Sequence, residues 1–206
     1  MDITKFMPVK VWLKEKPMKD STEHILIFDV EDWNAFLQNK VDLHPYYSSK
    51  GIVKGFATRK SLRKLNLISR AAHIFVLNSK GELFLQKRAS TKDIFPNLIA
   101  PSASGHTDIG EIPQQTAQRE LKEELEITGT PNFLGSIKCF TPQLKEFLDV
   151  FVLVTDELIK INEKEISEGY FVPLEEVYAK KIFSECVPAM QKELKKFKTK
   201  LKRFTK

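Results

Sequence analysis

The stretch from Pro113 to Leu125 constrains the fold more than any other part of this 206-residue chain. Pro113 suits the first turn of a helix, where its missing N–H costs nothing, and no later residue of the stretch breaks a helix. Ala117, Leu121 and Leu125 recur every four residues and form an apolar stripe. The stretch therefore predicts an amphipathic helix that packs its apolar stripe on a sheet.

Three glutamates stand beside this stripe. Glu120, Glu123 and Glu124 follow one another at i, i+3 and i+4, so they share one face of the helix. Like charges at this spacing repel by roughly 0.2–0.5 kcal/mol per pair, and the helix dipole disfavours anions near the C-terminal end. A hard cation such as Mg²⁺ or Mn²⁺, which prefers oxygen ligands, would offset these costs. For the three glutamates taken alone, a solvated acidic face paired with Lys122 is the alternative.

The residues around this helix resemble the Nudix box, the signature of the Nudix hydrolase superfamily. The box runs Gly, five residues, Glu, seven residues, Arg-Glu, an aliphatic residue, any residue, Glu-Glu, any residue, Gly and an aliphatic residue. Gly105, Glu111 and Arg119 have the family's spacings, and the match continues to Ile127. Glu126 is the one departure, because the family has Gly there to allow a left-handed exit from the helix. We expect Glu126 to cost about 1 kcal/mol or to shift the turn.

The resemblance implies a divalent-metal site on the helix. In it, Glu120, Glu123 and Glu124 are the catalytic metal ligands, and the carbonyl of Gly105 is an extra ligand. Mg²⁺ or Mn²⁺ would neutralise the oxygens of an anionic diphosphate and generate a hydroxide nucleophile. The implied reaction is hydrolysis of the diphosphate linkage of a nucleoside diphosphate-X or a related organic diphosphate, a small-molecule substrate.

Supporting roles follow from the same resemblance. Glu111 and Arg119 are implied to be structural orienters in the motif, since a guanidinium can hold a carboxylate through paired hydrogen bonds. The residue that activates water stays open between Glu123 and a later glutamate, Glu165 or Glu168.

The segment Gly81–Ala89 and Lys92 look like the branch of the superfamily that contains isopentenyl-diphosphate isomerases. Arg88 and Lys92 match diphosphate-contacting positions of that branch, and ordinary surface charge at a strand end is the alternative. Type 1 isomerases place a proton-transfer cysteine directly before their Gly-His pair, where this chain has Ser104, a far weaker acid. The upstream histidine positions of their metal site keep at most one nitrogen ligand here. We therefore favour a hydrolase, and keep an isomerase-like enzyme or a non-catalytic nucleotide-binding sensor as alternatives.

The pattern of elements predicts an α/β (α+β) domain with the Nudix fold, a mixed β-sheet sandwiched between helices. Two β-rich runs around the polar turn 78–81 predict a hairpin of 71–77 and 82–86. Further strands are expected at 24–28, 133–140, 147–154 and 168–173, helical segments at 31–37, 58–66, 174–177 and 184–204, and loops at 44–49 and 91–104, the latter with a short strand. His73 lies in an apolar run and is expected to be a satisfied core histidine, whereas His24 and His44 lack partners at useful spacing.

The chain is expected to divide into three parts. Residues 1–49 form an N-terminal extension that caps the site or mediates a dimer, residues 50–190 form the Nudix domain, and residues 191–206 form the basic end of an amphipathic C-terminal helix. The net charge of +6 is concentrated at that end, because residues 192–206 hold eight basic residues and one acidic one. Contact of this tail with nucleic acid or an anionic membrane stays open, without a nucleic-acid signature, and a helix docked on the domain is the alternative.

The cysteines and apolar runs bear on the compartment. Two scattered cysteines, Cys139 and Cys186, do not form a disulfide framework, which favours a reducing compartment. The sequence shows no secretory signal and no apolar run long enough to span a bilayer. We therefore expect a cytoplasmic protein.

Overall fold

The computed structural model describes residues 6–10, 25–29 and 42–205 of the chain. These residues belong to two compact units. Unit 1 comprises the described residues up to Arg70 together with His106–Gly110 and Lys138–Phe147. Unit 2 comprises Ala71–Gly105, Glu111–Ile137 and the described residues from Leu148 onward.

Unit 1 contains a small mixed sheet and one short helix. Its strands, in the order in which they pair, are β1 (Phe6–Lys10), β2 (Ile25–Asp29), β4 (Val53–Thr58) and β3 (Leu43–Tyr47). β2 and β4 run parallel, and the other two pairs are antiparallel. The expected basic helix is confirmed as α2 (Arg59–Lys64), and Thr58 caps it by accepting a hydrogen bond from the N–H of Ser61 at 3.1 Å.

The loop expected at 44–49 is wrong for its first part, since residues up to Tyr47 form β3 even though this strand contains Pro45. Among the described residues β3 pairs with β5 only at Tyr47 and Ile68, so most of one edge is open, where a strand tolerates proline. The helical turn expected at 31–37 lies outside the described residues.

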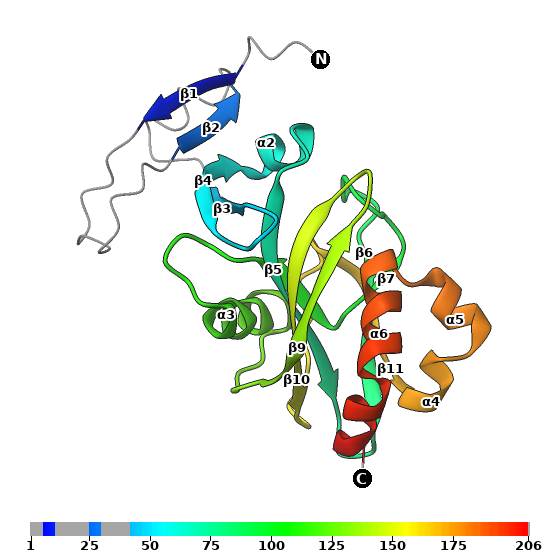
Figure 1. Ribbon diagram of the computed structural model, residues 1–206. Helices are drawn as coiled ribbons and strands as arrows, with labels where there is room; N and C mark the ends of the chain where they lie inside the picture. The colour runs from blue at the N-terminus through cyan, green and yellow to red at the C-terminus, as the bar shows by residue number, and fades with distance from the viewer. Residues whose placement is uncertain (1–5, 11–24, 30–41, 206) are drawn as a thin grey trace. The chain divides into compact units, whose positions relative to one another are not determined.

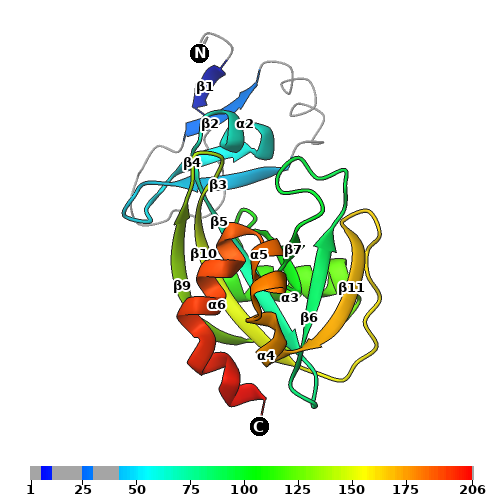
Figure 2. The ribbon, with the colours of Figure 1, turned by 90° about the vertical axis from the view of Figure 1, so that its right-hand side faces the viewer.

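Unit 2 is built on strands that pair around β5, and α3 lies on one face of them while α6 lies on the other (Figures 1 and 2). β5 pairs with β10, which pairs with β9; β6 pairs with β5, β7 and β11, and β8 pairs with β5. The strands that lie wholly or partly in this unit are β5 (Ile68–Leu77), β6 (Glu82–Arg88), β7 (Ile99–Ala100), β8 (Ala103–His106), β9 (Asn132–Phe140), β10 (Lys145–Val154) and β11 (Ile166–Pro173). The helical segments are α3 (Pro113–Leu125), α4 (Leu174–Val177), α5 (Lys180–Glu185), α6 (Pro188–Leu201) and the 3-10 turn η3 (Lys202–Phe204).

The alternation of side chains along β5 explains how both faces are covered. Ala72, Ile74 and Val76 belong to the same buried cluster as the apolar stripe of α3. His73, from the intervening set, points to the other face, where its Nδ1 lies 2.7 Å from the Glu193 carboxylate of α6. The expected core histidine at position 73 is therefore confirmed, and the expected hairpin of β5 and β6 is present.

The C-terminal segment docks on unit 2 through its apolar stripe. Leu194, Phe197 and Leu201 are buried, and Phe197 packs so closely on Gly135 that a Cβ there would come within 2.9 Å of its ring. The ammonium groups of Lys196 and Lys200 donate hydrogen bonds to backbone carbonyls of β9. The helix expected to be continuous over 184–204 is instead divided into α5, α6 and η3, because residues 186 and 187 are extended and Pro188 begins α6. None of the helices in the described part of the chain combines the length and the apolar character needed to cross a membrane.

The end of α3 carries the single departure from the motif. Glu126 adopts the left-handed conformation, with φ 55° and ψ 23°, and its N–H donates to the carbonyl of Lys122 at 3.2 Å. Its exposed carboxylate lies 3.2 Å from the ammonium of Lys160. The chain therefore makes the turn that the motif glycine favours, but with a side chain that this conformation disfavours.

We expect Glu126→Gly to raise the free energy of unfolding by about 1 kcal/mol, because glycine enters the left-handed region without a Cβ clash. Chemical denaturation measures the change. Glu126→Ala is the matched control: it also loses the Lys160 ion pair but keeps the Cβ, so it should gain nothing. A glycine variant no more stable than the alanine variant would contradict the explanation.

Candidate functional site

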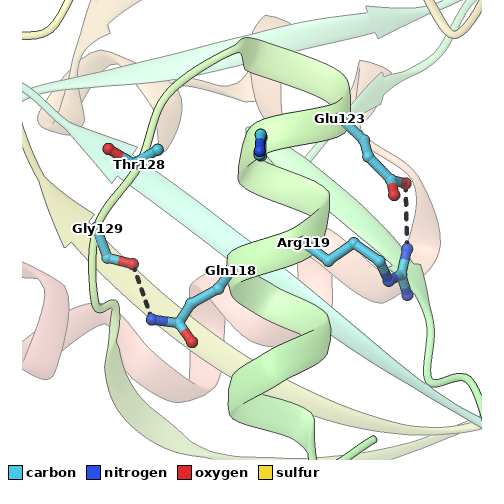
Figure 3. A pocket seen from close by; sticks show the side chains of 6 residues that line it. Gln118, Arg119, Glu123, Thr128 and Gly129 are labelled. Atoms are coloured by element: carbon cyan, nitrogen blue, oxygen red, sulfur yellow. Dashed lines mark hydrogen bonds and ion pairs between the residues drawn. The ribbon is translucent and has the colours of Figure 1, made fainter.

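The three glutamates of α3 differ in exposure. Glu120 and Glu124 are each 7% exposed, because they flank the stripe that packs on the sheet. Glu123 is exposed and points to the outer side of the helix, next to Arg119 (Figure 3). The side chains at 120 and 124 therefore form a buried pair, and Glu123 stands at the edge of an open groove along the outside of α3.

Arg119 connects three carboxylates. Its guanidinium binds both oxygens of Glu111, at 2.8 and 3.1 Å, and its Nη1 donates to Glu120 at 2.6 Å and to Glu123 at 3.2 Å. Thr116 donates a further hydrogen bond to Glu111 at 3.0 Å. Arg119 thus contacts Glu111, its expected partner in the motif, and also reaches Glu120 and Glu123. The role of Glu111 and Arg119 as orienters stays a prediction.

Gly105 is required by close approach. A Cβ at this position would lie 1.8 Å from Oε1 of Glu120, so any side chain would displace the carboxylate. This contact gives the motif glycine a physical reason that is independent of backbone φ. It does not test whether the Gly105 carbonyl binds a metal, which stays a prediction.

Glu124 is held from two other segments. Its Oε2 accepts a hydrogen bond from the Gln86 amide of β6 and another from the backbone N–H of Ser104, both at 3.1 Å. Sequence analysis did not single out Gln86 as a site residue. The sequence does contain a sign of its role, because Gln86 is a polar residue that directly follows the apolar run 83–85. The structure buries both this run and Gln86.

Burial and the neighbouring negative charge of Glu120 disfavour ionisation of Glu124 in the absence of a cation. Desolvation, and after it the charge of Glu120, raise the pKa of its carboxyl from 4.5 to about 8. Hydrogen bonds from Ser104 and Gln86 and the charge of Lys92 act in the opposite direction. Two neighbouring carboxylates whose ionisation is disfavoured by burial and mutual repulsion are a suitable donor set for a hard divalent cation.

Charge and donor type thus fit a cation, but the ligands are not yet gathered around one point. In the residues that the structure describes, no three His, Cys, Asp or Glu side chains form a ready metal-binding group. Arg119 draws Glu120 and Glu123 to its own guanidinium, whereas Glu124 is held by Gln86 and Ser104. A metal at this site would therefore compete with Arg119 for two of its ligands.

The other expected site residues lie at the end of β6 and in the loop after it, and just before and at the start of β11. Lys92 forms an ion pair with Glu165, and the N–H of Ala89 donates to the Glu165 carbonyl. Lys92 also acts electrostatically on Glu124, so it connects the Glu165 segment with α3. Arg88 donates to the carbonyl of Ile94 at 3.2 Å and thereby helps to fold the loop. Glu168 is exposed on β11, opposite Lys87 of β6.

Unit 1 holds a group of histidines and carboxylates that sequence spacing did not reveal. The buried His44 lies 3.1 Å from Asp108, and its ring centroid is 5.2 Å from that of His106. His106 in turn lies 3.3 Å from Glu146. The expectation that His44 lacks partners is wrong in space, because its partners come from distant segments.

Comparisons with known proteins agree on one family. Residues 67–190 match the model of the NUDIX domain. The chain is 32% identical over 120 residues to an uncharacterized Nudix hydrolase of Listeria monocytogenes, covering 56% of this chain and 70% of that protein. It is also 28% identical over 181 residues to isopentenyl-diphosphate Delta-isomerase 1 of Photorhabdus laumondii, covering 83% of this chain and 92% of that protein.

A solved structure supports the architecture. The crystal structure of DR0079 from Deinococcus radiodurans matches with a TM-score of 0.66 and 24% identity, over 75% of this chain and 98% of that one. At this identity the likeness concerns the fold alone. The expected fold class, a mixed sheet flanked by helices, is confirmed, whereas the expected three-part division of the chain stays a prediction.

The raised pKa of Glu124 predicts how the stability of the metal-free protein depends on pH. The unfolded chain loses this proton near pH 4.5 and the native protein near pH 8, so the native state binds more protons in between. The contribution of Glu124 therefore lowers the free energy of unfolding as pH rises through that window. We expect Glu124→Gln to exceed the unchanged protein in stability at pH 9 by on the order of a few kcal/mol, measured by denaturation with a chelator present. Glu123→Gln, at an exposed position, is the control, and pH profiles that are identical for the Glu124 variant and the unchanged chain would contradict the burial argument.

Proposed function

Because the chain belongs to the NUDIX family, we propose that it is a Mg²⁺- or Mn²⁺-dependent hydrolase that cleaves the diphosphate linkage of a nucleoside diphosphate-X or a related organic diphosphate. The observation that carries the proposal is the buried pair Glu120 and Glu124 on α3, next to Arg119, which Glu111 binds from the segment before the helix. Two neighbouring buried carboxylates are costly without a cation, and an anionic substrate needs one.

In this proposal Glu120, Glu123 and Glu124 hold the cation, with the carbonyl of Gly105 as a further ligand. When bound, the cation supplies charge neutralisation at the diphosphate oxygens and lowers the pKa of water. Arg119, fixed by Glu111, controls where Glu120 and Glu123 point, since it contacts both.

The end of β6 and the loop after it supply cationic groups for the substrate. We assign Lys92 and Arg88 to the diphosphate, Lys92 because its charge already acts on Glu124 beside the proposed cation site. Arg88 contributes mainly by folding the loop through the Ile94 carbonyl. A cytoplasmic location and a homodimer remain predictions that accompany this function.

An isomerase is the second candidate, because the Photorhabdus isomerase aligns with 83% of this chain. Against it stands Ser104, whose hydroxyl is a poor substitute for the proton-transfer thiol. The two functions leave different products: an isomerase interconverts prenyl diphosphates without releasing phosphate, whereas a hydrolase releases phosphate or a nucleoside monophosphate.

We expect metal-dependent release of phosphate or a nucleoside monophosphate when nucleoside diphosphate derivatives and prenyl diphosphates are screened with Mg²⁺ or Mn²⁺. Glu123→Gln and Glu124→Gln should each lower the rate by roughly 10²-fold or more, because each removes a charged ligand. Far-UV circular dichroism checks that both variants are folded. Glu175→Gln, which removes an exposed glutamate of α4 that pairs with Lys202, is the control and should keep full activity. Full activity in both α3 variants would refute the site, and binding of nucleotide without turnover would indicate a sensor.

The residue that activates water can be separated from the ligands. Glu165 lies next to Lys92 and Glu168 is exposed on β11, so neither is on the metal helix. If Glu165 is the base, Glu165→Gln should lower kcat by roughly 10²-fold or more while the Mn²⁺ affinity stays unchanged. Calorimetry measures the affinity and a steady-state assay the rate. If both Glu165→Gln and Glu168→Gln keep full kcat, the base is Glu123.

A further inference from the structure

Gln86 is a buried amide in a strand that otherwise contributes apolar groups. It is 2% exposed, and Leu83, Phe84 and Leu85 before it are also buried. Phe84 belongs to the cluster that packs against α3, and Gln86, two residues further along β6, points to the same face. An amide here costs free energy unless it is hydrogen-bonded, and an apolar side chain of similar volume would not.

The hydrogen bonds of Glu124 are unevenly divided between its two oxygens. The Gln86 amide and the Ser104 N–H both donate to Oε2, each at 3.1 Å. In the described part of the chain, both hydrogen bonds that this carboxylate accepts end on that one oxygen. Two donors from different strands fix the plane of the carboxylate and leave Oε1 available as a ligand.

We propose that Gln86 is a positioning residue, which holds Oε2 of Glu124 so that Oε1 is presented to the divalent cation. The inference rests on the proposed function, since it assumes that α3 holds a cation. The backbone donor at Ser104 is independent of side-chain identity, whereas the donor at Gln86 depends on it. Gln86 is therefore the side chain through which the sequence sets the orientation of this ligand.

The hydrogen bond from Gln86 to Glu124 also has an electrostatic effect. The charge of Glu120 disfavours ionisation of the buried Glu124, and the hydrogen bond from Gln86 acts in the opposite direction. Without Gln86 the carboxylate would keep only one hydrogen bond and could rotate away from the ligand position. Loss of such a supporting contact typically lowers metal affinity by roughly 10–100-fold.

The test of this role is the affinity of the whole chain for Mn²⁺, measured by titration calorimetry without substrate. Gln86→Met keeps the volume but removes the donor, and we expect Mn²⁺ affinity to fall by roughly 10–100-fold. At saturating Mn²⁺ most of kcat should return, because the ligand itself is intact. Gln86→Asn is the second variant: it stays polar but retracts the amide by one methylene, so its affinity should also fall even if the methionine variant folds poorly.

Gln118→Met is the matched control. It makes the same exchange on α3, but the Gln118 amide donates to the carbonyl of Gly129, on the side of the helix opposite Arg119 and Glu123 (Figure 3). Its Mn²⁺ affinity should equal that of the unchanged chain. A double variant, Gln86→Met with Glu124→Gln, should bind Mn²⁺ no more weakly than Glu124→Gln alone, because Gln86 acts through Glu124.

The outcomes separate this inference from the proposed function. Unchanged Mn²⁺ affinity in both Gln86 variants overturns the inference, as does an additive effect in the double variant. A chain that binds no Mn²⁺ at all overturns the inference together with the metal site. A chain whose Mn²⁺ affinity depends on Gln86 but which hydrolyses no diphosphate supports the inference and contradicts only the proposed reaction.

Discussion

The burial of two acidic side chains on one helix is the constraint on which unit 2 depends. Glu120 and Glu124 are carried inward by the same packing that buries the stripe of α3, so neither can turn to solvent without undoing the core. Hydrogen-bond donors from several segments bind these two side chains: Arg119 from the helix, Gln86 from β6 and the N–H of Ser104 from β8. The fold of unit 2 thus serves as a support for an arrangement that is unfavourable by itself.

This constraint also explains which parts were accessible from sequence. α3 and the β5–β6 hairpin follow from local periodicity and turn chemistry, and the Arg119–Glu111 contact follows from motif spacing. Gln86 and the Lys92–Glu165 pair could not be placed in this way, because their partners lie dozens of residues away and only the packing of strands brings them together. Pattern predicts which face a residue is on, but not which residue stands opposite.

Two further outcomes depend on neighbours in space. Residues 44–49 were expected to form a loop, but residues up to Tyr47 form β3, whose largely open edge tolerates Pro45. The basic tail carries the net positive charge of the chain, and the docked helix is the interpretation that is confirmed, because its apolar stripe is buried and Lys196 and Lys200 are bound to carbonyls of β9. In both cases the sequence shows the residue type, proline or lysine. It does not show the neighbouring strand that determines how the residue is accommodated.

Ser104 shows how one position can separate two chemistries on a single frame. Its backbone N–H holds Glu124, and this contact would be made by any residue other than proline. The side chain at 104 is therefore free to differ between a thiol and a hydroxyl without moving the carboxylate. A cysteine there would add a proton-transfer group beside the proposed metal ligand, whereas serine leaves the proposed site without one. The serine at this position is therefore the residue on which the proposal of hydrolysis, and not isomerisation, depends.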